Sequence, residues 1–311
     1  MSILSCSPLS PDVEESEFIV PTPTFSTLLA PLEAHLGYLT PLKSGSNKPL
    51  SYTFAHQVRA LVYYHVETYT SAQDLLTAAD SDAFVNLLLV PKTGLGQSTF
   101  YEANASRGSL QMQQLLDRLY KKASHCVGIP YIELGDLEAI DGSLVDACLS
   151  MAWADYRCGA RKAKMHLGFD LNRGIPRKMV LTDGKGAERP FVSELLEEGQ
   201  TGVLDRGYQD HQRFDDWIEQ DKHFVARVKK NTQWDVIEHL PFPEGTSIFS
   251  FAKVFLGDQD HRMTHPVYLV GFKSRGKTYW IATDRQDLPA QQIALIFALW
   301  WAVETFFAWW K

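Results

Sequence analysis

The sequence is poor in the residues that build disulfides and zinc sites. Its 311 residues include only four cysteines, and no two of them form a Cys-x-x-Cys pair: Cys6, Cys126, Cys148 and Cys158. The ten histidines are scattered and form no convincing metal-binding pair. This usage predicts a reduced, cytosolic protein without a zinc site. The start of the chain also lacks a basic segment followed by an apolar core, so no secretory signal peptide is expected.

The chain also lacks net positive charge. Its formal net charge of −7 by itself argues against a nucleic-acid partner. Residues 155–189 are a local exception, with nine basic residues against four acidic ones, and Arg227 begins a second basic cluster. Phosphate binding requires a local basic face rather than a basic protein, although a merely solvated charged face is the alternative. The candidate DNA-contacting residues in these clusters are Arg161, Lys162, Lys164, Lys229 and Lys230.

Two segments share one design, in which a short apolar run ends in an aspartate. The first covers residues 137–143 and holds Asp141, and the second covers residues 201–208 and holds Asp205. In both, a glycine follows the aspartate within two residues. Read as strands, both runs place a carboxylate at the strand's end, where the chain turns away. If the two strands lie side by side, Asp141 and Asp205 come within reach of one metal ion.

The surrounding pattern predicts further strands and two helices. Strands are expected at 164–171, 177–182 and 223–228, and helices at 189–197 and 211–221. The resulting order is strand, strand, strand, helix, strand, helix, strand. It predicts an α/β fold, α+β over the whole chain, in which a mixed sheet carries helices on its faces.

The flanking regions have different patterns. Residues 1–50 are rich in Ser, Pro and Thr, and we expect a loosely ordered arm with one or two short helices. Helical periodicity at 52–89 and 110–123 fits either a DNA-reading module or a plain helical hairpin. Beyond residue 230, three strand-like runs predict an antiparallel β insertion: 247–256, 265–273 and 277–283.

Several short motifs, taken in order, resemble one family. They are Ile-Asp-Gly-Ser at 140–143, Trp-Ala-Asp-Tyr-Arg at 153–157, His-Leu-Gly-Phe-Asp at 166–170, Leu-Thr-Asp-Gly at 181–184, Val-Leu-Asp-Arg-Gly-Tyr at 203–208 and Trp-Ala-Val-Glu-Thr-Phe-Phe at 301–307. The sequence resembles the DDE transposases of bacterial insertion sequences, in particular the insertion-sequence-four-like cut-and-paste family. The resemblance covers roughly residues 50–311, and it rests on the order and spacing of motifs that are weak singly.

The resemblance implies a ribonuclease-H-like catalytic domain and a division of the chain. It places a DNA-end-binding helical domain at 51–130, the catalytic core at 131–231, a β-rich insertion at 232–288 and the last core helix at 289–311, after the arm at 1–50. Relatives continue with further helix beyond this point, so the chain resembles a C-terminally truncated member.

Three carboxylates form the expected catalytic and metal-binding set, namely Asp141, Asp205 and Glu304. Oxygen-only ligands favour Mg²⁺ or Mn²⁺ over Zn²⁺. Two such ions can activate an attacking water or 3′-hydroxyl and stabilise the leaving oxygen of a phosphodiester. Taken singly, each residue is more typical of a surface or capping acid. The rival acids Asp170 and Asp183 are expected to form turns.

The residues beside Asp205 have two open interpretations. Arg206 either contacts a DNA phosphate or forms a salt bridge that orients Asp205. Tyr208 is a further candidate DNA contact.

The final apolar segment, residues 293–310, carries Glu304 as its one charged residue. Its length and hydropathy permit a membrane span, but a lone carboxylate at mid-bilayer is costly, which favours a buried core helix. The family pattern Tyr-x2-Arg-x3-Glu-x6-Lys, fixed at Glu304, places Phe297, Trp300 and Lys311 at its other positions, on one helical face. Lys311 fits the pattern as a DNA contact, whereas Phe297 and Trp300 lack the hydroxyl and the guanidinium.

These observations give three hypotheses. The first is a DNA transposase that uses two Mg²⁺ or Mn²⁺ ions, binds terminal inverted repeats of double-stranded DNA, and cleaves and joins phosphodiesters. The resemblance implies a homodimer on DNA, no membrane, and a place in the bacterial cytoplasm at the nucleoid. The second is a catalytically impaired, DNA-binding remnant that regulates the intact enzyme. The third is a protein anchored in a membrane by residues 293–310.

Overall fold

The chain divides into two compact units. The computed structural model describes residues 23–44, 48–146, 154, 161–186 and 189–310. Unit 1 is Met1–Leu119 and unit 2 is Tyr120–Lys311. The boundary falls inside one helix, α6, which runs from Ser109 to Cys126.

Unit 1 is helical. Before α6 it contains α1 Pro23–Leu36, α2 Phe54–Val66, α3 Ala72–Ser81, α4 Ala83–Leu89 and α5 Gln97–Ser106. Thr53 and Ser71 cap α2 and α3 with reciprocal capping boxes, and the Asp82 carboxylate accepts two backbone N–H groups at the start of α4. The predicted helices at 52–89 and 110–123 are therefore confirmed. Recognition of DNA ends by this unit stays a prediction.

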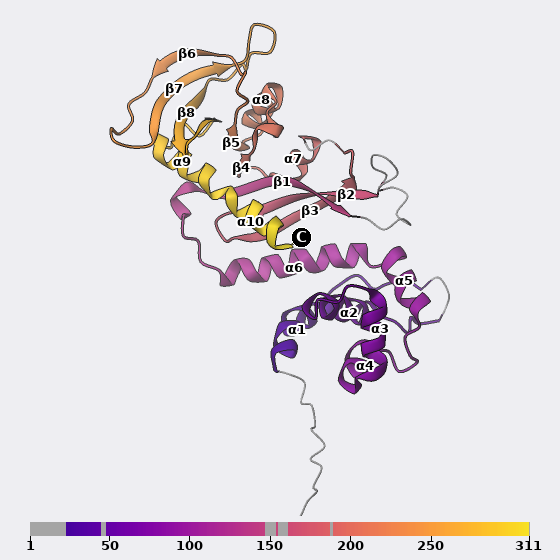
Figure 1. Ribbon diagram of the computed structural model, residues 1–311. Helices are drawn as coiled ribbons and strands as arrows, with labels where there is room; N and C mark the ends of the chain where they lie inside the picture. The colour runs from indigo at the N-terminus through magenta and orange to yellow at the C-terminus, as the bar shows by residue number, and fades with distance from the viewer. Residues whose placement is uncertain (1–22, 45–47, 147–153, 155–160, 187–188, 311) are drawn as a thin grey trace, which may run out of the picture. The chain divides into compact units, whose positions relative to one another are not determined.

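Unit 2 is built on one nine-stranded sheet (Figure 1). The order of its strands is β3-β2-β1-β4-β5-β9-β8-β7-β6. Strands β1, β2 and β3 pair with one another in antiparallel order, whereas β4 and β5 run parallel to β1. The α/β, ribonuclease-H-like mixed sheet expected from the sequence is confirmed. Its first five strands are β1 Leu137–Asp146, β2 Lys162–Asp170, β3 Ile175–Asp183, β4 Thr201–Leu204 and β5 His223–Arg227.

The β insertion extends this sheet. Strand β9 pairs with β5, and the remaining strands follow outward in antiparallel order. The four strands are β6 Trp234–His239, β7 Ile248–Leu256, β8 Val267–Ser274 and β9 Lys277–Thr283. The sequence predicted three of them. Strand β6 was missed because Asp235–His239 are all exposed, so this edge strand has no alternation of buried and exposed residues.

Helices cover both faces of the first five strands. Along β1, Ala139 belongs to one hydrophobic core and Ile140 to the other, as expected when successive side chains point to opposite faces. The core that contains Ala139 packs against α9 Ala290–Leu299 and α10 Trp301–Trp310. The core that contains Ile140 packs against α7 Arg189–Leu195 and α8 His211–Glu219.

Residues 290–310 are long and apolar enough to cross a membrane. They form two successive helices, with Trp300 between them, rather than the one continuous helix expected from the sequence. Ile293, Ile296, Val303 and Phe307 lie in the core against the sheet. A third of the most apolar 18 residues is buried inside the protein, and the remainder is at least partly exposed, so the choice between a core helix and a membrane span stays a prediction.

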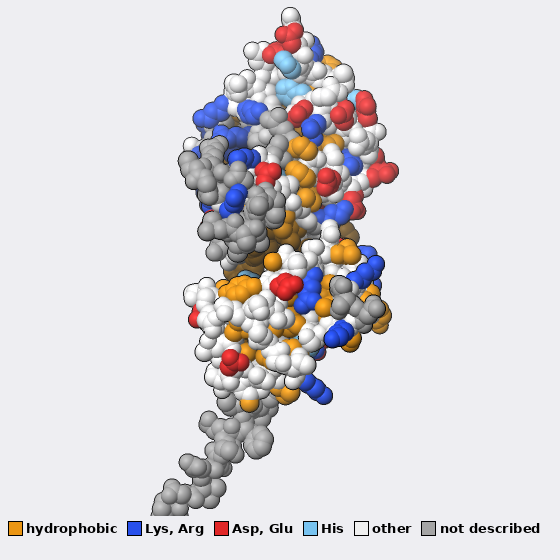
Figure 2. All heavy atoms as spheres, turned by 90° about the vertical axis from the view of Figure 1, so that its right-hand side faces the viewer, with side chains coloured by type: hydrophobic (Ala, Val, Ile, Leu, Met, Phe, Trp, Pro, Cys, Tyr) orange, Lys and Arg blue, Asp and Glu red, His pale blue; other side chains and the backbone are white. Residues whose placement is uncertain are grey.

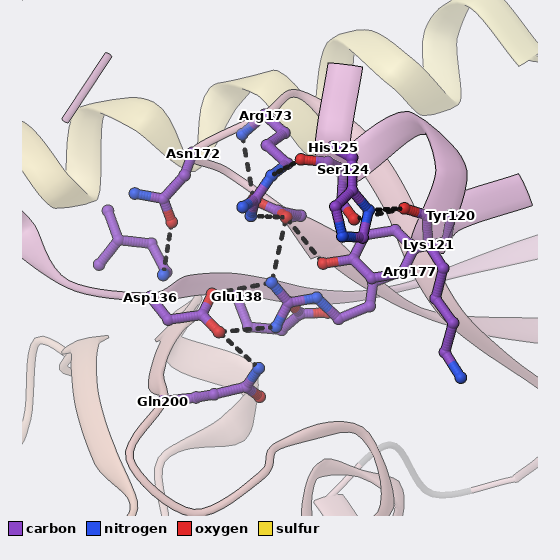
Figure 3. A network of polar contacts seen from close by, with 12 residues as sticks. Tyr120, Lys121, Ser124, His125, Asp136, Glu138, Asn172, Arg173, Arg177 and Gln200 are labelled. Carbon is purple, nitrogen blue, oxygen red and sulfur yellow. Dashed lines mark hydrogen bonds and ion pairs between the residues drawn. The ribbon is translucent and has the colours of Figure 1, made fainter. Parts of the chain in front are cut away.

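An ionic network, buried except at Asp136, lies where β1 begins (Figure 3). The Arg177 guanidinium donates to Asp136 at 2.8 and 3.2 Å and to Asp170 at 3.1 Å. Asp170 also accepts hydrogen bonds from the Arg173 side chain and the Tyr120 hydroxyl, both at 2.9 Å. Burial disfavours the ionised carboxyl, but the hydrogen bonds from Arg173 and Arg177 hold the pKa of Asp170 below its usual value.

Glu138 is the third carboxyl group of this network, beside Asp136 and Asp170. It lies directly opposite Asp170 across β1 and β2, and its side chain is fully buried. Among the described residues, neither of its carboxylate oxygens has a hydrogen-bond partner, although Arg177 Nη1 lies 3.0 Å from Oε2. Burial raises the pKa of Glu138 to about 8, against the attraction of Arg177. A protonated Glu138 leaves two arginines to balance Asp136 and Asp170.

The pKa of Glu138 predicts a loss of stability as the pH rises. Folded Glu138 keeps its proton up to about pH 8, whereas the unfolded side chain ionises near 4.5. The unfolded chain therefore binds fewer protons in this window, and the free energy of unfolding falls by at most ~1.4 kcal/mol per pH unit. We expect Glu138→Gln to lose less stability than the wild type between pH 5 and 8, measured by urea unfolding. An equally steep loss in E138Q would assign the effect to another group.

Candidate active site

Asp141 and Asp205 occupy equivalent positions on neighbouring parallel strands. The register of β1 and β4 pairs Leu137 with Thr201 and ends with Ile140 opposite Leu204. The next residue along the chain is an aspartate in both cases: Asp141 continues β1, and Asp205 directly follows β4 with an extended backbone, φ −78° and ψ 167°. Neighbouring strands lie about 4.8 Å apart, so the two carboxylates start from adjacent backbone positions. The sequence-based expectation of two side-by-side strands holds.

Alternation along the strands decides which face carries these aspartates. Ile140 and Leu204 point into the core beneath α7 and α8, whereas Ala139 and Val203 point into the core beneath α9 and α10. Asp141 and Asp205 follow Ile140 and Leu204, so they share the face of α9 and α10.

Glu304 lies on the same face. It is in the first turn of α10 and is exposed, between Val303 and Phe307, which are buried against the sheet. A surface pocket of about 540 Å³ brings Glu304 and Asp141 together. Its other lining residues are Gly142, Ser143, Leu144, Lys164, Phe307 and Ala308.

The three carboxylates have the right donor atoms for a hard cation, but they do not lie close enough together to hold one. Asp141, Asp205 and Glu304 offer only carboxylate oxygens, the ligands that Mg²⁺ and Mn²⁺ prefer. Within the described parts of the chain, however, no three His, Cys, Asp or Glu side chains are gathered closely enough to hold a metal ion. Asp141 and Asp205 are adjacent by strand register, and Glu304 faces Asp141 across a pocket.

Asp205 already has a cationic partner. Arg227, the last residue of β5, donates from Nη1 to Asp205 Oδ1 at 3.2 Å. Its guanidinium carbon also lies 5.0 Å from the centre of the Tyr279 ring. Leu204 pairs with Ala226 in parallel strands, so the next residues, Asp205 and Arg227, are neighbours. In the same way, Asp205 is the neighbour of Asp141.

Sequence comparison decides the family. The model of the transposase DDE domain matches residues 135–311, more than half of the chain and nearly all of unit 2. This chain belongs to the DDE transposases.

Curated relatives agree with this assignment. The chain is 29% identical over 164 residues to a protein named as the transposase of insertion sequence element IS5377 from Geobacillus stearothermophilus, a match over 52% of this chain and 44% of the relative. A transposase of element IS4SA from Synechocystis is 28% identical over 153 residues, covering 48% and 44%. The matched region thus spans about half the length of these relatives.

A solved structure is also similar. The piggyBac transposase synaptic complex with hairpin DNA matches 90% of this chain and 64% of its own, at 12% identity and a TM-score of 0.43. At this level the likeness adds nothing to the strand order described above.

The structure around Asp141 differs from what the sequence predicts. We expected this aspartate where its strand ends and the chain turns away, but β1 continues to Asp146. Gly142 pairs with His166 of β2 instead of forming a turn. What ends after Ile140 is the pairing with β4, so the carboxylate lies where the parallel and antiparallel halves of the sheet separate. Asp170 and Asp183 do form turns, since each accepts a backbone N–H two or three residues later.

The basic residues have varied surroundings, and their contact with DNA stays a prediction. Lys164 lines the carboxylate pocket and donates to Gly186 O at 3.1 Å, whereas Lys162 pairs with Asp146 at 2.6 Å. Figure 2 shows Lys and Arg side chains gathered on one side of unit 2. Arg206 and Lys230 are exposed. Arg161 and Lys229 are half-buried, and Lys311 lies outside the described residues.

Tyr208 is the exception among the candidate DNA contacts. Only 2% of it is exposed, and it packs in the core beneath α7 and α8. Any contact of its side chain with DNA therefore requires the surrounding segment to open.

Phe297 and Trp300 do not share a face with Glu304. They are 3% and 6% exposed, their rings stack at 6.2 Å between centroids, and both belong to the core against the sheet, whereas Glu304 is exposed. The reason is the spacing of Phe297, Trp300, Val303 and Phe307, which aligns four apolar side chains along one buried stripe.

The burial of Trp300 predicts that its substitution lowers the stability of the fold much more than substitution of the exposed Trp301. Replacing it by Arg, the residue of the family pattern, should remove a packed indole and bury a cation. We expect W300R to lower the free energy of unfolding by at least ~3 kcal/mol, measured by urea unfolding. Trp301→Arg is the matched control, since Trp301 is 55% exposed, and it should change stability by no more than ~0.5 kcal/mol. Equal effects of the two variants would contradict the buried position of Trp300.

Proposed function

We propose that this chain binds the terminal inverted repeats of its own element, cleaves DNA there and transfers the resulting ends to target DNA. The register of Asp141 and Asp205, with Glu304 across a shared pocket, carries this proposal. Family membership supports a DNA transposase in general. The metal-dependent steps, the two ions and action as a homodimer on DNA are part of this proposal.

The three carboxylates would hold Mg²⁺ or Mn²⁺. The ions would supply an activated water or 3′-hydroxyl and a stabilised leaving oxygen. Asp141, which neighbours Asp205 by strand register and shares a pocket with Glu304, would serve both ions, while Asp205 and Glu304 would each serve one. Lys164, in the same pocket, would place a positive charge beside the scissile phosphate.

The first test is substitution of the carboxylates. Asp141→Asn, Asp205→Asn and Glu304→Gln should each lower Mn²⁺-supported cleavage of DNA carrying the element's inverted repeats by about 100-fold or more, since even outer-shell partners of metal ligands cost 10- to 100-fold. Binding to the same DNA, measured by gel shift, should change little.

Asp146→Asn is the control for this test. Asp146 lies on the same strand but pairs with Lys162 and is exposed, so D146N should cleave like the wild type. Wild-type cleavage rates in D141N or D205N would contradict the metal assignment.

A second candidate is a catalytically impaired protein that occupies element ends and regulates an intact transposase. It is favoured by Asp205 already being paired with Arg227 and by Glu304 lying outside any close carboxylate group in the described residues. Phe297 and Trp300, which lack the polar groups of the family pattern, point the same way. Binding of repeat DNA without cleavage by the wild type would establish this alternative.

We further propose that the chain acts in the bacterial cytoplasm at the nucleoid and not in a membrane. The packing of α9 and α10 on the sheet supports a core role for residues 290–310. Recovery of the protein in the membrane fraction, resistant to salt washing, would instead support the membrane-anchored alternative.

A further inference from the structure

Arg227 is fixed beside the candidate metal ligand Asp205. The ion pair joins Nη1 to Oδ1 at 3.2 Å, and the two side chains keep 27% and 29% of their surface exposed. Along β5, Val225 lies in the core beneath α9 and α10, and Ala226 lies in the opposite core. Arg227 therefore points to the same face as Asp141 and Asp205.

The guanidinium is also held from the β insertion. Its carbon lies 5.0 Å from the centre of the Tyr279 ring, a distance suited to cation–π attraction. Tyr279 is 8% exposed and stacks on Phe272 at 5.4 Å, so its ring is fixed. On β9, Tyr279 is two residues from Ile281, which pairs with Arg227 across the strands. The stacked rings of Tyr279 and Phe272 thus hold the Arg227 guanidinium next to Asp205.

We propose that Arg227 is an internal cation that competes with a divalent metal ion for the Asp205 carboxylate, and that a DNA phosphate relieves this competition by drawing the guanidinium away. This inference rests on the proposed function, in which Asp205 is a metal ligand. A guanidinium matches phosphate oxygens with two parallel hydrogen bonds, and the exposed part of Arg227 is open to such a ligand. The site then loads metal most readily when DNA is bound, and by linkage metal strengthens DNA binding.

A purely structural role for Arg227 predicts the opposite sign. If Arg227 only orients Asp205 for the metal ion, its removal weakens metal binding. If Arg227 competes with the metal ion, its removal strengthens metal binding in the absence of DNA, because the carboxylate loses its other partner.

The experiment is calorimetric titration of the full chain with manganese chloride in the absence of DNA. Arg227→Gln should bind Mn²⁺ about fivefold more tightly than the wild type, the effect of removing one partly exposed ion pair. Arg227→Met, which keeps a long chain on Tyr279, should behave like R227Q and guards against a folding defect in either variant. Arg227→Lys keeps the charge and should stay near the wild type.

A second titration tests the coupling to DNA. With a saturating duplex that carries the inverted repeat, Mn²⁺ affinity should rise in the wild type and rise less in R227Q. The proposal is overturned if R227Q and R227M bind Mn²⁺ as tightly as the wild type or more weakly. It is also overturned if Mn²⁺ binding is too weak to measure in the wild type and in both variants.

Asp205→Asn separates this inference from the proposed function. If D205N loses Mn²⁺ binding while R227Q binds no more tightly than the wild type, only the competition is wrong. If D205N binds Mn²⁺ as the wild type does, Asp205 is not a metal ligand, and the proposed function fails with it.

Discussion

The site depends on the parallel register of three neighbouring strands. Because side chains alternate between faces, Asp141, Asp205 and Arg227 must all point to one face once β1, β4 and β5 pair as they do. A shift of one residue in any strand would turn its polar side chain into the core beneath α7 and α8. The apolar residues before them hold the register, since Ile140, Leu204 and Ala226 fill that core.

The β insertion is coupled to this site through the sheet itself. Strand β9 pairs with β5, so Tyr279 is placed against Arg227 by backbone hydrogen bonds and by stacking on Phe272. The helix pair α9–α10 packs on the same core and carries Glu304. The strands that carry the candidate carboxylates, the insertion and the last helix therefore meet on one face of the sheet.

Local patterns made most of this architecture predictable, and long-range contacts account for the rest. Short apolar runs identified the central strands, and apolar periodicity identified the helices, whereas β6 was missed because its residues after Trp234 are exposed. Gly142 signals a turn in the sequence, but pairing with β2 keeps it extended. The burial of Trp300 was foreseeable from its position three residues from Phe297 and Val303 and seven residues from Phe307, which lie on one side of a helix. The pairing of Arg227 with Asp205 was not, because it joins residues on separate strands.

The formal charge of −7 is a poor guide to how this chain meets a polyanion. It counts Glu138 as ionised, although burial raises the pKa of Glu138 to about 8 and so keeps it largely protonated at neutral pH. The total also says nothing of where the charges lie: Asp136 and Asp170 pair with Arg173 and Arg177, so these four charges cancel one another locally. Charges paired within a fold contribute little to the field outside it. In the proposed function, the local charge around the carboxylate pocket matters more than the total. Lys164 lines this pocket and Arg227 pairs with Asp205, so an acidic protein can still present a face suited to phosphate.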